Sequence, residues 1–508
     1  MATLWHLLTL ALVAAAVHGE PVQKQNLTLP EGADTQREAV VDIFVHSYEA
    51  YMKYAWGHDD LLPISESYAD IRNGWGASIV DAMSTMWIMG RYDWFNQAVN
   101  HTATVDFRKS QTNDTVNVFE TTIRYVGGLL SAYELSGYQY DVLVDKAEQA
   151  AQQMAYAWVG NNAIPFSSIN FTGHEPTIAN GSIAGVGTLT LEWNRLSLYT
   201  KNDTYRQLVE KSVQHIINMP SPLPGIPGQG IDPTTGKAVG GYSWGGGSDS
   251  YFEYLIKYPR LTNTDDNSYA DAWLTAIDTS IKKLLRTSTV GDWVYLADYD
   301  DDKLIRHVGS HLACFSGGNW ILGGKLTNND TLVNIGLQLT DACWNTYAST
   351  ATGIGPEEFA YVSSDGNYTG ASGPDEEQLQ FYNKHGFYIT TPYYILRPEV
   401  LESNFYAWRV TGDTKYLDNA ASAIKSFQKY LANTVAYTSI YDVDNTQSAK
   451  ADIMESFWFA EVLKYLYLTF DDPKHISLDD YVFNTECHPF KAPAAKSVYG
   501  SGPKAYSP

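Results

Sequence analysis

The sequence predicts an all-α fold, a single large domain made of repeated helical hairpins. Apolar residues recur at helical spacing in several segments, and these segments end at short turns rich in glycine, asparagine or aspartate. No Pro/Ser-rich linker, charge block or low-complexity tract divides the chain before its last residues. Hairpins repeated at irregular intervals favour a helical toroid or solenoid, with a plain helical bundle as the alternative.

Three segments carry the helical period most clearly. They are Phe119, Ile123, Val126, Leu129, Leu130 and Tyr133; Leu401, Phe405, Tyr406 and Trp408; and Phe457, Val462, Leu463, Leu466 and Tyr467. Gly90, Gly137 and Gly412 follow helical segments and suit left-handed C-caps. The Asp or Asn that follows such a turn is expected to cap the next helix.

Residues 1–19 are predicted to be a signal peptide. The apolar stretch Leu7–Val17 is too short to span a bilayer, and it ends in the small-residue pattern Val17-His18-Gly19. An uncleaved anchor is the alternative, because no Lys or Arg precedes the stretch. Residues 20–490 are expected to form one domain in the secretory pathway, secreted or in a vesicle lumen, and residues 491–508 a flexible tail.

Composition narrows the class of partner. The net charge of −23 argues against nucleic acids and anionic membrane surfaces, whereas a neutral, hydroxyl-rich ligand is compatible with it. Eight Asn-X-Ser/Thr sequons are candidate glycosylation sites: Asn26, Asn100, Asn113, Asn170, Asn180, Asn202, Asn329 and Asn367. The three cysteines, Cys314, Cys343 and Cys487, do not match a zinc site and leave one disulfide plausible.

Acidic residues within apolar helical segments are the candidate catalytic groups. Glu120 and Arg124 share a helix face at i, i+4, where burial is expected; a surface ion pair is the alternative. Asp249 near a helix start is equally consistent with a cap and with catalysis. Glu399 stands beside Arg397 and three residues before Glu402.

Glu461 lies in a very apolar helix, so its carboxylate must be paired, protonated or serving a ligand. Acidic groups in aromatic-rich helices fit glycoside hydrolysis, which needs one carboxyl group to protonate the leaving oxygen and another to activate water or attack. No Gly-x-Ser-x-Gly elbow, phosphate-binding loop or His-Glu-x-x-His motif occurs in the sequence.

These segments resemble the class I α-1,2-mannosidases, glycoside hydrolase family 47, from roughly His58 to Pro489. The blocks that carry the resemblance are RNGWGASIVDA (72–82), FETTIRYVGGLLSAYEL (119–135), LEWNRLS (191–197), DSYFEYLIK (249–257), HLACFSGG (311–318), GIGPE (353–357), YILRPEVLES (394–403), ESFWFAEVLKYLYL (455–468) and VFNTECHP (482–489). The resemblance implies an (α/α)7 barrel, an inverting mechanism, and high-mannose N-glycans on glycoproteins as substrates of a monomeric enzyme.

The resemblance also implies residue roles. Glu120, Asp249 and Glu399 take the places of the catalytic carboxylates, with Glu399 as the general base. Glu120 would be the general acid through a water, with Asp249 the rival. Thr485 would bind Ca²⁺, whose preference is for oxygen ligands. Further residues would contact sugar, carboxylates or metal-bound waters, namely Arg124, Glu253, His311, Glu357, Arg397, Glu402, Phe457, Glu461 and Glu486; Cys314 and Cys343 match the family's disulfide.

Three departures from the family pattern stand out. Ser84 occupies a position where many members carry Asp, and Cys487 replaces an alanine beside the metal motif, where we expect it to be buried. Gly247 replaces the arginine of the endoplasmic-reticulum subgroup, which favours the secreted fungal subgroup that trims several mannoses. The alternatives are a lectin-like protein of the same fold and a helical-barrel glycosidase of another specificity.

Overall fold

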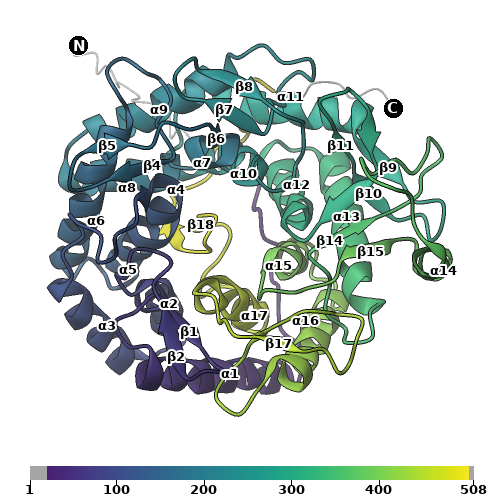
Figure 1. Ribbon diagram of the computed structural model, residues 1–508, viewed down its shortest axis with the longest axis horizontal. Helices are drawn as coiled ribbons and strands as arrows, with labels where there is room; N and C mark the ends of the chain where they lie inside the picture. Colours follow the sequence, from purple (N-terminus) through teal and green to yellow (C-terminus); the bar gives the residue numbers. More distant parts are fainter. Residues whose placement is uncertain (1–19, 503–508) are drawn as a thin grey trace, which may run out of the picture.

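The chain folds into a closed double ring of helices. The computed structural model describes residues 20–502. Within this part of the chain, seven inner helical segments contact one another in sequence order, and the last, η5, contacts the first, α2. Figure 1 shows this ring with a second layer of helices around it. The predicted all-α (α/α)7 barrel is therefore confirmed.

The inner segments are α2 (Ala77–Ile88), η1 with α5 (Thr121–Val126, Gly127–Leu135), α8 (Thr190–Thr200), α10 (Asp249–Thr262), α12 (Phe315–Leu326), α15 (Glu399–Thr411), and η5 with α17 (Trp458–Val462, Leu463–Thr469). The outer helices are α1 (Ala33–Tyr54), α3 (Tyr92–Thr104), α6 (Asp141–Met154), α9 (Thr204–Ile217), α11 (Ser268–Lys283), α13 (Asp330–Ala348) and α16 (Lys415–Ser426). Each inner segment from α2 to α15 packs on the outer helix that follows it, whereas α17 packs on α1.

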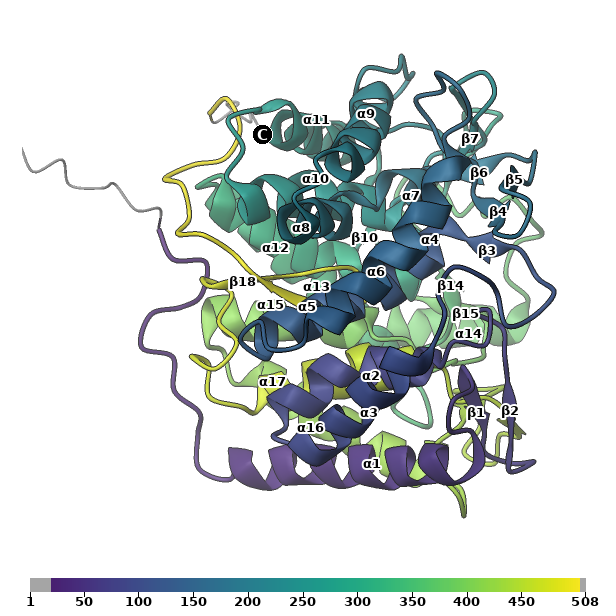
Figure 2. The same cartoon turned by 90° about the vertical axis from the view of Figure 1, so that its left-hand side faces the viewer.

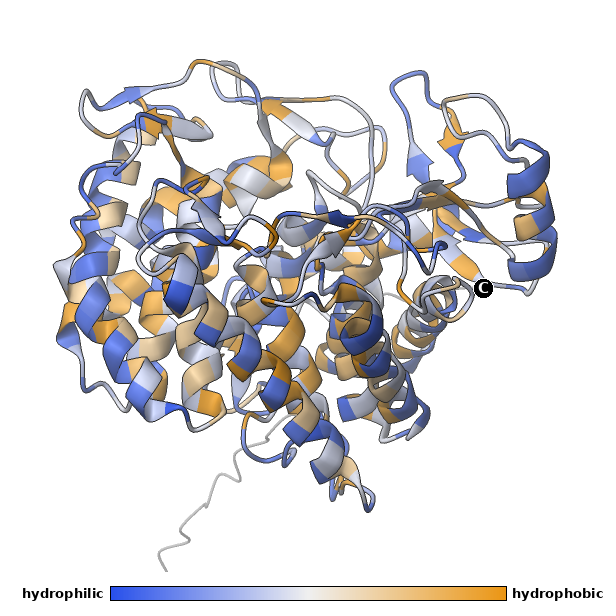
Figure 3. Cartoon of the chain, turned by 60° about the horizontal axis from the view of Figure 1, so that its bottom comes forward, coloured by the Kyte–Doolittle hydropathy of each residue, from blue (hydrophilic) through white to orange (hydrophobic). Residues whose placement is uncertain are grey.

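Burial explains which helices lie inside. In α10 every residue from Ser250 to Leu261 is buried, whereas α9 buries only one face. A helix that is apolar nearly all round needs partners on every side, and a helix with one apolar stripe suits the outer layer. Figure 3 shows the outer helices banded in hydrophilic and hydrophobic residues.

Short antiparallel strands and loops gather at one end of the barrel, as Figure 2 shows. They are β1 (Asp60–Leu62), β2 (Ser67–Ala69), β3 (Val116–Asn117), β4 (Ser168–Asn170), β5 (Glu175–Pro176), β6 (Gly181–Ser182), β7 (Gly230–Asp232), β8 (Lys237–Val239), β9 (Leu285–Thr287), β10 (Val294–Leu296), β11 (Asp298–Tyr299), β12 (Ile305–Arg306), β13 (Val308–Ser310), β14 (Glu358–Ala360), β15 (Tyr388–Thr391), β16 (Ser439–Ile440) and β17 (Lys450–Ala451). The short helices α4 (Val118–Glu120), α7 (Ile183–Gly187) and α14 (Glu376–His385) join them.

One hairpin has a different place. β18 (Tyr481–Phe483) and β19 (Pro489–Lys491) pair antiparallel, and Figure 1 shows β18 inside the ring of helices. The turn between them, residues 484–488, is almost entirely buried. This turn carries Thr485, so the hairpin delivers the predicted metal ligand to the middle of the barrel.

The predicted helical segments all form, but the helix ends differ in part from expectation. Gly412 is a left-handed C-cap whose N–H donates to the Trp408 carbonyl, as predicted. Asp203 precedes α9 without capping it, because its carboxylate binds Arg206 instead. The neighbouring Asn202 caps instead, because its Oδ1 accepts a hydrogen bond at 3.2 Å from the N–H of Thr204, the first residue of α9.

The expected flexible tail also differs from the structure over residues 491–502. Tyr499 is 3% exposed, its N–H donates to the Leu326 carbonyl, and its hydroxyl donates to Asn263. Lys496 binds the Thr264 carbonyl. The buried Tyr499 holds this segment against the barrel although its composition is rich in small residues. Residues 503–508 lie outside the described part of the chain.

The remaining predictions concern the disulfide, the sequons and membrane-spanning segments. Cys314 and Cys343 form a disulfide with Cα atoms 5.9 Å apart. Asn329 is half-buried and its side chain caps α13; the other sequon asparagines, Asn26, Asn100, Asn113, Asn170, Asn180, Asn202 and Asn367, are exposed. Among residues 20–502, no helix is both long and apolar enough to cross a membrane. The predicted signal peptide, residues 1–19, lies outside the described residues.

Candidate active site

A cavity of about 270 Å³ lies where the inner helices begin, next to the β18–β19 turn. Asp249 and Glu399 are the first residues of α10 and α15, and Glu120 immediately precedes η1. The positive ends of α10 and α15 therefore face this space and favour negative charge there. Most of the predicted site residues line this cavity: Glu120, Arg124, Asp249, Glu253, Arg397, Glu399, Glu402, Phe457, Glu461, Thr485 and Glu486.

Glu399 is held as a carboxylate. His311 Nδ1 lies 2.6 Å from Glu399 Oε2, and His311 Nε2 lies 2.7 Å from the Tyr347 hydroxyl. Burial alone would raise the pKa of Glu399, but the His311 hydrogen bond and the positive charge of Arg397 lower it below its ordinary value. His311 was predicted to contact either sugar or a carboxylate. It does not line the cavity, and its contact is with the Glu399 carboxylate.

Asp249 has the opposite tendency. Burial, together with the charges of Glu399 and Glu253, raises the pKa of Asp249 to about 7, although the Ser250 N–H donates to its Oδ1 at 2.9 Å. Ser248, not Asp249, occupies the N-cap position of α10. Asp249 is therefore a carboxyl group that can carry a proton near neutral pH.

Glu120 forms the predicted i, i+4 ion pair, with Arg124 Nε donating to Glu120 Oε2 at 2.7 Å. Arg124 is 6% exposed and Glu120 is half-buried, so the pair is not a surface feature. Arg72 Nε lies 3.9 Å from the same oxygen. Burial acts to raise the pKa of Glu120, but the charges of Arg124 and Arg72 outweigh it and lower the pKa.

A second group of carboxylates lies around Thr485. Glu402, Glu461 and Glu486 are at most 8% exposed. Burial raises the pKa of Glu461 well above its ordinary value, and the negative charges of Glu486 and Glu399 raise it further. Glu486 is paired with Arg124, whereas Glu461 has no ion pair within residues 20–502.

This donor set fits a divalent cation that prefers oxygen. No cluster of three or more His, Cys, Asp or Glu in the described part of the chain is arranged to hold a metal directly. Thr485 offers oxygens at the cavity, and burial together with the negative charges of Glu486 and Glu399 raises the pKa of Glu461, another residue of this cavity, well above its ordinary value. A cation bound by Thr485 and by waters, with carboxylates behind the waters, agrees with both observations.

The remaining predicted residues lie around the same cavity. Phe457 is 7% exposed, and its ring centroid lies 5.4 Å from Arg124 Cζ. Glu253 is paired with Lys257 at 2.5 Å, which offsets the like-charge spacing with Asp249. Glu357 binds Arg397 Nε at 2.7 Å.

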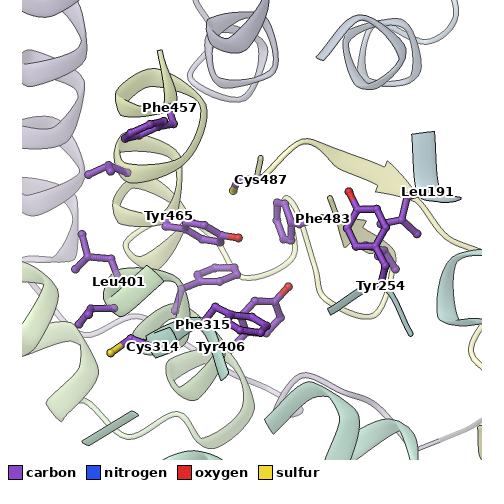
Figure 4. Packing of buried hydrophobic residues seen from close by; sticks show 14 of the residues in the cluster. Leu191, Tyr254, Cys314, Phe315, Leu401, Tyr406, Phe457, Tyr465, Phe483 and Cys487 are labelled. Atoms are coloured by element: carbon purple, nitrogen blue, oxygen red, sulfur yellow. The ribbon is translucent and has the colours of Figure 1, made fainter. Parts of the chain in front are cut away.

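Of the three positions that depart from the family pattern, Gly247 lines the cavity, whereas Ser84 and Cys487 are fully buried. Ser84 Oγ lies 3.0 Å from His488 Nδ1, and Asp81 lies 3.3 Å from His488 Nε2. Cys487 is a buried free cysteine, as expected, and burial raises its pKa to about 12. Figure 4 shows it near Tyr465 and Phe483, whose ring centroids are 6.0 Å apart.

Sequence reasoning quoted Arg72 only as part of a motif block and missed its role. Arg72 binds Asp60 at 2.7 Å and Glu455 at 2.6 Å and places a positive charge beside Glu120. The only sign of this role in the sequence is the run of glycine and tryptophan that follows Arg72. Leu312 and Phe315 also line the cavity and stood only within the quoted block HLACFSGG, whereas Ser182 and Ala184, which line it too, had no signal in the sequence.

Comparisons with known proteins agree with this geometry. The profile described as "Glycosyl hydrolase family 47" matches residues 43–492. A mannosyl-oligosaccharide alpha-1,2-mannosidase 1B of Emericella nidulans is 39% identical over 482 residues, covering 90% of this chain and 93% of that protein. A mannosyl-oligosaccharide alpha-1,2-mannosidase of Coccidioides posadasii is 40% identical over 479 residues, covering 89% and 90%. The solved alpha-1,2-mannosidase from Trichoderma reesei superposes with a TM-score of 0.87 at 37% identity, covering 91% of this chain and 99% of that one.

Proposed function

The chain belongs to glycosyl hydrolase family 47, and from this premise we propose that it is a mannosyl-oligosaccharide 1,2-α-mannosidase that removes terminal α-1,2-linked mannose from high-mannose N-glycans, from Man9 towards Man5. The observation that carries the proposal is one cavity lined by carboxyl groups of opposite ionisation tendency. Glu399 is held ionised, whereas the pKa of Asp249 is raised by burial to about 7. Glycoside hydrolysis by inversion requires such a base and such an acid.

In this mechanism Glu399 takes a proton from the attacking water. The His311 hydrogen bond fixes the carboxylate, and Arg397 helps to keep it charged. Direct attack of that water on the anomeric carbon inverts its configuration.

Asp249 is the better candidate for the proton donor. Glu120 is paired with Arg124, and its lowered pKa disfavours the protonated form that a general acid needs. This assignment reverses the order given by the family resemblance, in which Glu120 is the acid. Glu120 then serves to keep Arg124 and Arg72 in place at the cavity.

We also propose Ca²⁺ as the cofactor. Thr485 would hold it through its hydroxyl and carbonyl oxygens, and Glu402, Glu461 and Glu486 would hold its waters. When bound, the ion supplies positive charge beside these carboxylates and coordination for sugar hydroxyls. Phe457 presents an apolar ring to the sugar in the same cavity.

The test is release of mannose from Man9, followed by mass spectrometry, with EDTA and after restoring Ca²⁺. We expect stepwise loss of α-1,2 mannoses that EDTA stops and Ca²⁺ restores. Proton NMR at early times should show β-mannose as the first product, because inversion acts on an α linkage. Binding of the glycan by a folded sample without any release would instead support the lectin-like alternative.

A further inference from the structure

The turn between β18 and β19, which carries Thr485, is organised by its first residue, Asn484. Asn484 Oδ1 accepts hydrogen bonds from the N–H of Glu486 at 3.1 Å and the N–H of His488 at 2.7 Å. Asn484 Nδ2 donates to the Ile123 carbonyl at 2.9 Å. One buried amide therefore closes the turn on itself and fixes it to the inner ring of helices.

Glu192, in α8, is a second partner of this amide. Asn484 Nδ2 also donates to Glu192 Oε1 at 2.8 Å, and the Glu192 side chain is fully buried. The hydroxyl of Tyr254, in α10, donates to the same oxygen at 2.5 Å. Two inner helices and the hairpin turn therefore meet at one carboxyl oxygen.

Tyr254 connects this oxygen to Thr485. The N–H of Thr485 donates to the Tyr254 hydroxyl at 3.2 Å, while that hydroxyl donates to Glu192. A hydroxyl that accepts and donates at the same time strengthens both bonds, most of all where water is excluded, and Tyr254 is 2% exposed. The main chain of Thr485 is thus held relative to both α8 and α10.

The inner segment η1–α5 leaves room for the amide of Asn484. A Cβ added at Gly127 would lie 2.6 Å from Asn484 Nδ2 and 3.5 Å from Glu192 Cγ. Because the interior is close-packed, a side chain at position 127 would push the amide away from Glu192.

Keeping a carboxyl group at this buried position costs free energy. Glu192 Oε2 has no hydrogen-bond partner within residues 20–502. Burial raises the pKa of Glu192 to about 7, although the hydrogen bonds from Tyr254 and Asn484 act to lower it. An apolar side chain of similar size would avoid this cost but could not bind the turn. The hold on the turn that carries Thr485 therefore accounts for a polar group here.

We propose that Glu192 and Tyr254 are positioning residues for the cation at Thr485, and that they act by fixing the main chain of the residue whose hydroxyl and carbonyl would bind Ca²⁺. The proposal rests on the proposed function, because the Ca²⁺ site is part of it. Neither residue lines the catalytic cavity, so their effect reaches the ion only through the hairpin turn.

Tyr254→Phe removes one hydroxyl group, keeps the ring, and leaves the N–H of Thr485 without its acceptor. We expect this variant to raise the Kd for Ca²⁺ about tenfold or more, the usual effect of losing a residue that orients a metal ligand. The measurement is isothermal titration of Ca²⁺ into the EDTA-treated protein. The rise in Tm at a fixed Ca²⁺ concentration should become smaller in parallel.

Tyr258→Phe is the matched control. Tyr258 lies one turn further along α10, is also 2% exposed, and its hydroxyl also donates to a glutamate, Glu210 of the outer helix α9. It should lower the Tm in EDTA about as much as Tyr254→Phe does, but leave the Kd for Ca²⁺ unchanged. If Tyr254→Phe lowers the Tm in EDTA and still binds Ca²⁺ with the wild-type Kd, its role is only structural and the proposal is wrong.

Two variants of Glu192 separate hydrogen bonding from charge. Glu192→Gln keeps a carbonyl oxygen for both bonds and should bind Ca²⁺ within about threefold of the wild type, whereas Glu192→Leu should weaken binding at least as much as Tyr254→Phe. Equal weakening by both variants would contradict the proposal, because the charge of Glu192 would then be what matters. A folded wild type that binds no Ca²⁺ would overturn the proposed cofactor itself, whereas wild-type binding that Tyr254→Phe and Glu192→Leu leave unchanged would overturn only this inference.

Discussion

Replacing Asp249 by asparagine tests which carboxyl group donates the proton. With a pKa of about 7, Asp249 is about nine-tenths protonated at pH 6 and about one-tenth protonated at pH 8. The wild-type kcat/KM for α-1,2-mannobiose should therefore fall about tenfold between these values. Asp249→Asn should remove this alkaline limb and lower kcat/KM by roughly 10²–10⁴, the usual contribution of a general acid.

A substrate whose leaving group needs no proton distinguishes the general acid from the general base more sharply. Fluoride departs from α-mannosyl fluoride without needing a proton, so Asp249→Asn should keep most of its activity on this substrate. Glu399→Gln should lose activity on both substrates, because each still requires an activated water. All assays contain saturating Ca²⁺. Because a nearby cation lowers the pKa of a carboxyl group, it moves the alkaline limb to lower pH without removing it, and the fall between pH 6 and pH 8 is then at least about tenfold.

Glu120→Gln is the decisive comparison. Glu120 is ionised beside Arg124, so this variant should lose activity on both substrates through misplaced arginines. The opposite result would refute the assignment of the acid to Asp249. In that result Glu120→Gln regains activity on α-mannosyl fluoride, whereas Asp249→Asn is inactive on both substrates and its residual activity keeps the alkaline limb.

Three further predictions follow from the same contacts. His311→Ala should raise the pKa of Glu399, so the acidic limb of the kcat/KM profile should move to higher pH; an unmoved limb would contradict the hydrogen bond's role. Thr485→Val should weaken Ca²⁺ binding, seen as a smaller rise in Tm on adding Ca²⁺, and an equal rise would place the ion elsewhere. Cys314→Ser with Cys343→Ser opens a loop spanning 29 residues and should lower the free energy of unfolding by about 3.6 kcal/mol in denaturant titration, while no change would show that the loop is held without the bond.

The helical layers follow from local sequence, because the 3.6-residue period of apolar side chains is a local property. The segment from Phe119 to Tyr133 showed it and forms η1 and α5. Within residues 20–502 the π-helical turns are η1, η4 (Phe427–Leu431) and η5, and they escaped prediction, because one extra residue in a turn leaves the apolar pattern nearly unchanged.

For the site, the sequence identified most of the residues but not their ionisation states. The resemblance named the carboxylates, but their states depend on neighbours distant in the chain, such as His311 for Glu399. Neither the buried position of Asp249 nor the charge of Arg72 beside Glu120 has a local signal.

The place of the β18–β19 hairpin has a consequence for the newly made protein. Glu120 emerges from the ribosome early, but Thr485 and Glu486 emerge some 365 residues later, and α17 must also arrive before α1 has its inner partner. Until then the ring is open and the carboxylates of α10 and α15 face an unfinished wall. A nascent chain of this protein therefore cannot trim the glycans around it, and activity should begin in a single step when the last hairpin enters the barrel.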